Sequence, residues 1–256
     1  MKLLFVLLST LPLVAFCQKD STKTRGVVFG ITYSPDYCFR TLKPDGSEIA
    51  QTIANRRNAD EKPVFGFTTG LSVLFPVSTR FIFETGVHYS SKGEQTKKFD
   101  LVWPQPDPSL PVKISSVHHY NYLDIPFKAQ FLFARSRMVP LKFLKKVMRG
   151  KVSGSDIGFF VSGGFSANVF LNESNTSTSE YSDGHVDTQK SYLYDGLSRV
   201  NIAAIAGIGM KYFIAQRISI RIEPVFRHSI TPILDAPIKQ YLWSAGVNAG
   251  LCFSLK

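Results

Sequence analysis

The sequence predicts an all-β fold: an eight-stranded antiparallel transmembrane β-barrel that follows a cleaved signal peptide. Eight stretches alternate apolar and polar residues with a period of two, which is the pattern of β-strands. Their polar side is rich in glycine and serine, as expected of a narrow barrel lumen. Most connections between them are alternately long and short. Outer-membrane barrels have this arrangement, with long outer loops and short periplasmic turns.

The signal peptide is predicted from the first 17 residues. A lysine at position 2 precedes an apolar run and then small residues, which is typical of exported proteins. We expect residues 1–17 to be removed, 18–25 to form a periplasmic leader and 26–256 to form the barrel domain. In the alternative, a lipoprotein, Cys17 would carry the lipid, but the bulky Phe16 before it disfavours this.

The eight alternating stretches follow in order after the leader. They are 29–40, 65–75, 81–89, 122–133, 157–169, 200–212, 218–227 and 243–255. Polar connections at 41–62, 91–118 and 172–198 are interpreted as extracellular loops, and the short ones at 76–79 and near 215–216 as periplasmic turns. Residues 122–133 alternate most clearly, and their length suits a tilted membrane-crossing strand, which needs about nine to eleven residues.

One connection, from Ala134 to Asp156, breaks the loop rule. It begins with a basic stretch, and residues 140–150 predict a short amphipathic helix that starts at proline and ends at glycine. One half of the helical wheel is apolar: Leu141, Phe143, Leu144, Val147 and Met148. The other half is basic: Lys142, Lys145, Lys146 and Arg149. We expect a periplasmic helix at the membrane interface. The alternatives are a docking helix for a periplasmic partner and a solvated basic loop.

Composition excludes several classes of protein. The formal net charge is +11, but much of the excess lies between Arg135 and Lys151, so nucleic-acid binding is not expected. Three cysteines in 256 residues do not make a disulfide framework. Cys38 and Cys252 both face the lumen, on the first and last strands. Because they fall near opposite ends of the barrel, we expect two free thiols.

Beyond the alternation, one short motif indicates a family. The segment Tyr122-Leu123-Asp124-Ile125-Pro126 resembles a strand of PorT-like outer-membrane β-barrel proteins, and the glycine-containing strands at 160–164 and 207–209 are also similar to theirs. The resemblance covers 26–256 and implies a single barrel domain. Some such proteins take part in protein secretion. The chain departs from the family at its end, Phe253-Ser254-Leu255-Lys256, where these barrels often finish on an aromatic residue.

The sequence offers little catalytic chemistry. It has no Walker loop, zinc-protease helix, CxxC or GxSxG motif, and we expect no cofactor and no metal site. The alternation places nine charged or titratable residues inside: Arg40, Arg80, Glu84, His88, Asp124, Lys128, Arg221, Glu223 and Arg227. Hairpin pairing puts Glu84 near Lys128 and His88 near Asp124. We interpret the set as an ion-pair network that fills the lumen.

The functional expectation is a non-enzymatic barrel of the bacterial outer membrane. It would act as a binding or scaffold protein, or as a component of secretion, through its extracellular loops and basic helix. The expected partners are outer-membrane lipid, the barrel-assembly machinery and an envelope or secretion protein. One alternative is an outer-membrane hydrolase or acyltransferase that uses His88, Asp124 and Ser90. The other is a soluble lipocalin-like carrier.

Overall fold

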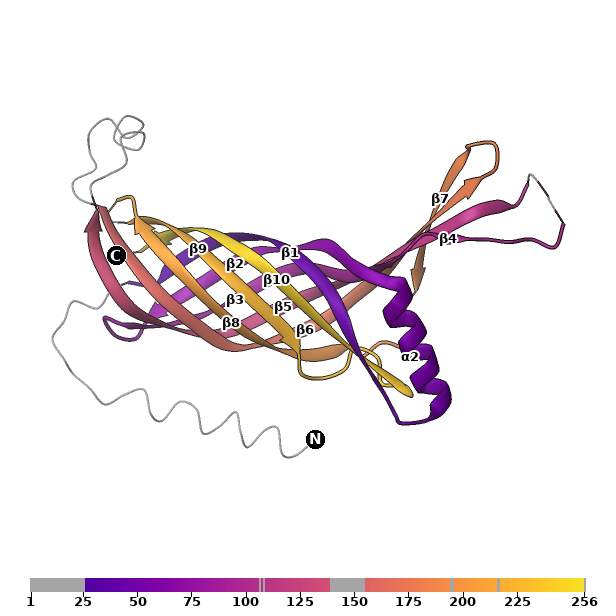
Figure 1. Ribbon diagram of the computed structural model, residues 1–256. Helices are drawn as coiled ribbons and strands as arrows, with labels where there is room; N and C mark the ends of the chain where they lie inside the picture. The colour runs from indigo at the N-terminus through magenta and orange to yellow at the C-terminus, as the bar shows by residue number, and fades with distance from the viewer. Residues whose placement is uncertain are drawn as a thin grey trace.

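The computed structural model describes residues 26–105, 107, 109–138, 155–193, 196–215 and 217–255. These form one twisted, closed sheet and a single helix (Figure 1). The strands and the helix are β1 Val28–Pro44, α2 Glu48–Asp60, β2 Glu61–Pro76, β3 Phe81–Thr96, β4 Phe99–Asp100, β5 Pro111–Met138, β6 Ser155–Tyr181, β7 Val186–Leu193, β8 Val200–Phe213, β9 Ile218–Ser229 and β10 Ile238–Ser254.

Eight of the strands close into a barrel. The sheet order is β4-β5-β3-β2-β1-β10-β9-β8-β6-β7, and β5 also pairs with β6. The first and last strands meet at the seam, where Val28 lies opposite Ser254. The barrel strands are therefore β1, β2, β3, β5, β6, β8, β9 and β10, whose pairings are all antiparallel. The predicted eight-stranded barrel is confirmed. Each barrel strand contains one of the eight alternating stretches, except that β10 ends at Ser254, one residue before the end of the last stretch.

The apolar side chains of the barrel strands point outward. Phe127 in the middle of β5 is 49% exposed, whereas Lys128 beside it is 3% exposed. Aromatic side chains gather near one end, where Tyr37, Phe39 and Phe226 contact Trp243. Others lie near the opposite end, where Phe81 packs on Phe131. An apolar outer band between two aromatic girdles is the surface of a barrel in a bilayer. Among the described residues, no helix is long and apolar enough to cross a membrane.

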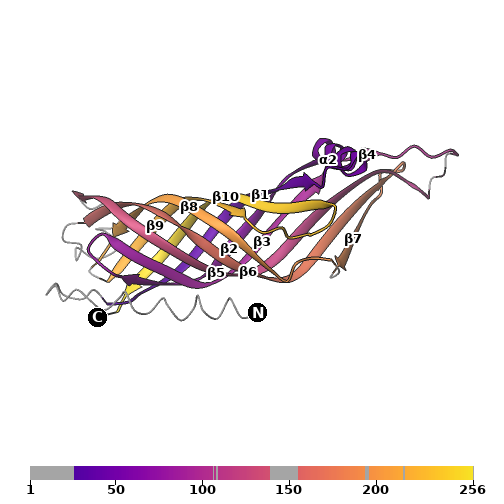
Figure 2. The same ribbon diagram turned by 90° about the horizontal axis from the view of Figure 1, so that it is seen from below.

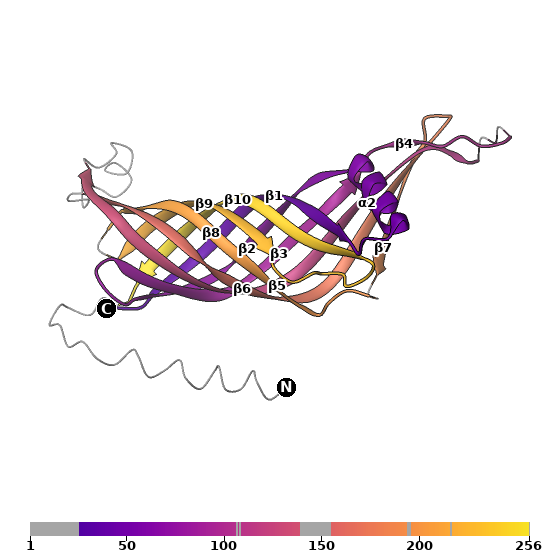
Figure 3. The same ribbon diagram turned by 60° about the horizontal axis from the view of Figure 1, so that its bottom comes forward.

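The two ends of the barrel differ. The short β2–β3 and β8–β9 connections and the C-terminus lie at one end, and α2, β4 and β7 lie at the other (Figures 1 and 3). Because outer-membrane barrels have short periplasmic turns and long outer segments, the first end is periplasmic. Figure 2 shows the strands tilted relative to the barrel axis. The tilt is expected, since a sheet closes into a barrel only when its strands are inclined.

Three predicted loops are structured differently from the expectation. Residues 41–62 contain α2, whose N-cap Ser47 accepts a hydrogen bond at Oγ from the Ala50 amide. Residues 91–118 and 172–198 contain the outer halves of β3, β5 and β6, together with β4 and β7. The β5–β6 ladder runs on from Asn121↔Asn172 to Pro111↔Tyr181. The outer parts of β5 and β6, like β4 and β7, carry no amphipathic alternation, because beyond the membrane neither face has to meet lipid.

Two further expectations concern the thiols and the basic insert. Cys38 and Cys252 are free and buried, as predicted. Cys38 lies opposite Ser244 on β10, eight residues from Cys252, which is about 26 Å at roughly 3.3 Å per residue. The predicted amphipathic helix at 140–150 lies outside the described residues, as do the signal peptide and the leader.

Candidate functional site

Four charged side chains form the centre of the barrel lumen. Arg221 of β9 donates two hydrogen bonds to Glu84 of β3, of 2.6 Å from Nη1 to Oε2 and 2.9 Å from Nη2 to Oε1. Lys128 Nζ lies 3.3 Å from Glu84 Oε2 and 3.2 Å from both carboxylate oxygens of Glu223. All four are buried. Two positive and two negative charges balance, as a dry interior requires.

Neutral groups complete this central cluster. Glu223 also accepts hydrogen bonds from Ser162 Oγ at 2.5 Å and from Asn248 Nδ2 at 3.2 Å. Gln130 donates to Glu84. Glycine makes the space, because a Cβ at Gly207 would lie 2.9 Å from Glu223 Oε1. The glycine-rich inner face noted in the sequence is thus matched to the bulk of the charged side chains.

A second group of charges lies farther toward the extracellular end. Arg227 Nη1 donates to Asp36 Oδ1 at 2.9 Å, and Asp36 also accepts from Ser34 and Thr68. Lys92 Nζ lies 3.0 Å from Asp124 Oδ2. A Cβ at Gly246 would lie 1.9 Å from Asp36 Oδ1, so this position has to be glycine for the carboxylate to fit. Together with the central cluster, these residues form what we call the luminal network.

The third group connects α2 to the mouth of the barrel. Arg40 of β1 pairs with Glu61 at 2.8 Å and donates to Asn58 Oδ1 at 2.5 Å. Glu61 also pairs with Arg57 at 2.6 Å. Nearby, the buried carboxylate of Glu94 accepts from Tyr120 and Gln240 at 2.9 and 3.1 Å. Burial raises the pKa of Glu94 above its usual range.

Six of the nine predicted inward residues lie in the luminal network: Glu84, Asp124, Lys128, Arg221, Glu223 and Arg227. A seventh, His88, is also buried inside the barrel, beside Ser72. Both predicted register pairs occur, with Glu84 opposite Lys128 and His88 opposite Asp124. Arg40 is buried but belongs to the α2 contacts. Arg80 is exposed, and its placement inside was wrong, because it lies in the β2–β3 turn, where strand alternation no longer applies.

Sequence reasoning left several network residues out. Asp36 falls on the inner face of the stretch 29–40 but is absent from the nine residues predicted to form the network. Lys92 and Glu94 fall in a predicted loop, although they continue the even-numbered inner face of β3 beyond Glu84 and His88. Extending the alternation past Ser90 would have found them. Among the described residues, no cluster of His, Cys, Asp and Glu is arranged to hold a metal ion.

The alternative catalytic set does not assemble as a triad. His88 Nε2 lies 3.0 Å from Ser72 Oγ, and Asp124 pairs with Lys92. Ser90, the hypothetical nucleophile, is fully buried, and its hydroxyl has no hydrogen-bond partner among the described residues. A nucleophile needs a base within hydrogen-bond reach and access for the substrate. Neither condition is met at Ser90.

The comparisons with known proteins agree with this architecture. The model of the family described as outer membrane protein beta-barrel domain matches residues 17–235. The chain belongs to this family. It is therefore a protein of the bacterial outer membrane, and the soluble-carrier alternative is not retained.

Several solved structures of outer-membrane proteins match this chain at low sequence identity and low TM-score. Neisserial surface protein A is 11% identical, with a TM-score of 0.39 over 90% of this chain and 97% of that one. OprG from Pseudomonas aeruginosa is 9% identical, with a TM-score of 0.38 over 91% and 98%. The outer membrane protease OmpT from Escherichia coli is 7% identical, with a TM-score of 0.34 over 93% and 99%. No protein of curated function matched the sequence.

Proposed function

We propose that this outer membrane beta-barrel domain protein is a non-enzymatic binding protein that holds a partner protein at its extracellular extension. The extension consists of α2, β4, β7 and the outer parts of β3, β5 and β6. The observation that carries the proposal is the β5–β6 ladder, which continues past the barrel and is widened by β7 (Figure 1). Charged and polar side chains fill the middle of the lumen and its extracellular end, so on the extracellular side the extension is the surface on which binding can occur.

The β7 strand gives the extension a means of recognition. Within the described residues, β7 pairs with β6 alone, so its other edge presents backbone N–H and C=O groups. Its described side chains, from Val186 to Tyr192, are exposed. An extended segment of another protein can add to such an edge as a further strand. We therefore infer that the partner contributes a strand or extended peptide to β7.

The internal chemistry supports a non-enzymatic role. One observation favours the alternative of an outer-membrane hydrolase or acyltransferase: His88 and Asp124 are neighbours in register. Against the enzymatic alternative, the polar contact of His88 is with Ser72 and that of Asp124 is with Lys92, which is the arrangement of a structural network.

A secretion role rests on the PorT-like resemblance and is a second form of the same proposal, in which the bound partner is a secretion component.

The test shortens the extension without altering the barrel. Replacing residues 177–189 with Asn-Gly joins Thr176 to its register partner Lys190 through a tight hairpin turn. We expect the native complex, isolated from membranes after mild solubilisation, to lose its partner in this variant and to retain it in His88→Ala. If the shortened protein folds and still retains the same partner, the proposal is wrong. Loss of the partner in His88→Ala alone would favour the lumen as the working site.

A further inference from the structure

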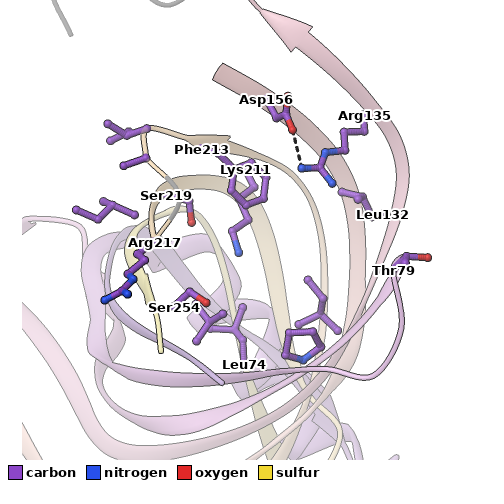
Figure 4. Close-up of a pocket in the computed structure, with 16 residues that line it drawn as sticks. Leu74, Thr79, Leu132, Arg135, Asp156, Lys211, Phe213, Arg217, Ser219 and Ser254 are labelled. Carbon is purple, nitrogen blue, oxygen red and sulfur yellow. Dashed lines mark hydrogen bonds and ion pairs between the residues drawn. The ribbon is translucent and has the colours of Figure 1, made fainter. Parts of the chain in front are cut away.

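The periplasmic end of the lumen contains an open cavity that the luminal network does not fill. Its volume is about 710 Å³ (Figure 4). Residues from β1, β2, β3, β5, β6, β8, β9 and β10 line it, so it is a chamber of the barrel itself rather than a groove in one loop. Cavities of roughly 300–1,000 Å³ are the usual size for small-molecule sites. It lies at the end opposite the extension proposed to bind a protein.

The inner wall of this cavity is apolar. Val28 and Leu74 are buried and pack with Ile82, and Leu132 continues the same surface. Leu74 lies opposite Glu84 in register, so the apolar layer begins where the luminal network ends. Inward positions elsewhere in the barrel are mostly polar. A concave apolar surface behind a polar rim is typical of a ligand site, because it offers apolar area that a ligand can remove from water.

The rim of the cavity is predominantly basic. Of the described residues, Arg135 and Arg217 line it, against one acid, Asp156. Arg135 Nη2 donates to Asp156 Oδ2 at 2.6 Å (dashed line in Figure 4), which neutralises that acid. In Figure 4 the Lys211 side chain extends into the cavity. The guanidinium of Arg217 therefore places positive charge beside a largely apolar chamber.

We propose that this cavity binds an anionic amphiphile with one acyl chain in the barrel. The chain lies against Val28, Leu74 and Leu132, and the acidic head contacts Arg217. Two sources have this chemistry: a free fatty acid, and an anionic phospholipid of the inner leaflet that inserts one of its chains. The proposal goes beyond the extracellular binding role and does not depend on it.

The experiment uses the purified full-length protein in a non-ionic detergent, with native mass spectrometry as the readout. Oleate, phosphatidylglycerol and zwitterionic phosphatidylethanolamine are added separately. We expect one bound molecule of oleate or phosphatidylglycerol and at least fivefold weaker retention of phosphatidylethanolamine. Retention of oleate alone assigns the site to a free fatty acid, and retention of phosphatidylglycerol alone assigns it to membrane lipid. Retention of both supports the shared chemistry.

Two variants and one control locate the binding. Ala215→Trp adds bulk at the mouth, in a turn outside the barrel strands, and Arg217→Glu reverses an exposed rim charge. Each should weaken the anionic adduct at least fivefold. Lys62→Glu makes the same charge reversal at the extracellular end and should leave binding unchanged. Heat-dependent gel mobility shows that each variant is folded. No adduct with either anionic probe, equal retention of phosphatidylethanolamine, or unchanged binding in both folded variants would overturn the proposal.

Discussion

Glu84 and Arg221 form a two-bonded ion pair across the lumen, between strands that are not neighbours in the sheet. Both side chains are completely buried. The pair ties β3 to β9 through the interior, and Lys128 and Glu223 extend it to β5 and back to β9. Charges on opposite walls of the barrel thus fix the positions of strands that share no backbone hydrogen bonds.

The first prediction concerns this pair. Glu84→Gln keeps the shape of the side chain but leaves Arg221 without its main counter-charge, and such a loss costs about 3–5 kcal/mol for a buried pair. We expect a matching fall in the free energy of unfolding, measured by urea titration of the detergent-solubilised barrel. Asp235→Asn, which breaks the exposed pair with Lys239, is the control and should change little. An equal change in the free energy of unfolding for Glu84→Gln and Asp235→Asn would show that the barrel interior is not dry.

The sequence predicts the contacts of the luminal network between neighbouring strands but not those across the lumen. Alternation and the hairpin between β3 and β5 were enough to place Glu84 opposite Lys128, because one hairpin register fixes every neighbouring pair. Contacts across the lumen, such as Asp36 with Arg227, depend on the tilt and stagger of the closed barrel. No local pattern in the sequence specifies these quantities.

The extracellular elements were missed for a different reason. The buried face of α2 consists of two alanines, Ala50 and Ala54, so residues 48–60 show almost no helical apolar stripe. Arg40, Arg57 and Glu61 hold the helix through ion pairs formed only in the folded protein. The outer parts of β5 and β6 are rich in Ser, Thr and Asn, and backbone pairing rather than an apolar face holds them.

The second prediction tests the outward face. Phe127 is exposed at the middle of β5, at the depth of the hydrocarbon core, where an arginine costs about 2–4 kcal/mol. We expect Phe127→Arg to reduce the folded fraction strongly, measured by heat-dependent gel mobility of outer-membrane extracts. Ile230→Arg places the same charge at an exposed site just beyond the extracellular end of β9 and should assemble normally. Normal assembly of both variants would show that the face is not in lipid.

The third prediction concerns conduction. Arg40, Arg221, Gln130, Glu84 and Glu223 are among the largest fully buried side chains, and all point into the barrel. The lumen of an eight-stranded barrel is just wide enough for its side chains to fill it. In planar bilayers we therefore expect no steady conductance from the native protein. Glu84→Ala combined with Arg221→Ala removes two of these side chains and should produce brief openings. Steady channels from the native protein would contradict the filled lumen.

The fourth prediction uses two adjacent histidines in the extension. His118 Nδ1 lies 3.0 Å from Glu173 Oε1, and this hydrogen bond raises the pKa of His118 above 6.5. Burial lowers the pKa of its neighbour His119 below 6.5. The stability that protonated His118 contributes is complete below its unfolded pKa and is lost as the pH rises through the raised value. The β5–β6 ladder should therefore loosen between neutral and mildly alkaline pH.

Two measurements check the histidine prediction. An NMR titration should give midpoints above 6.5 for His118 and below 6.5 for His119, with the first moving toward 6.5 in Glu173→Gln and the second unchanged. Amide exchange near Asn175, the register partner of His118, should accelerate with rising pH beyond the intrinsic rate in the native protein. In Glu173→Gln that excess should disappear, because the residue that raises the pKa of His118 is gone. An unchanged His118 midpoint in that variant would mean that Glu173 does not hold the imidazolium, and the pH response of the extension would then need another titrating group.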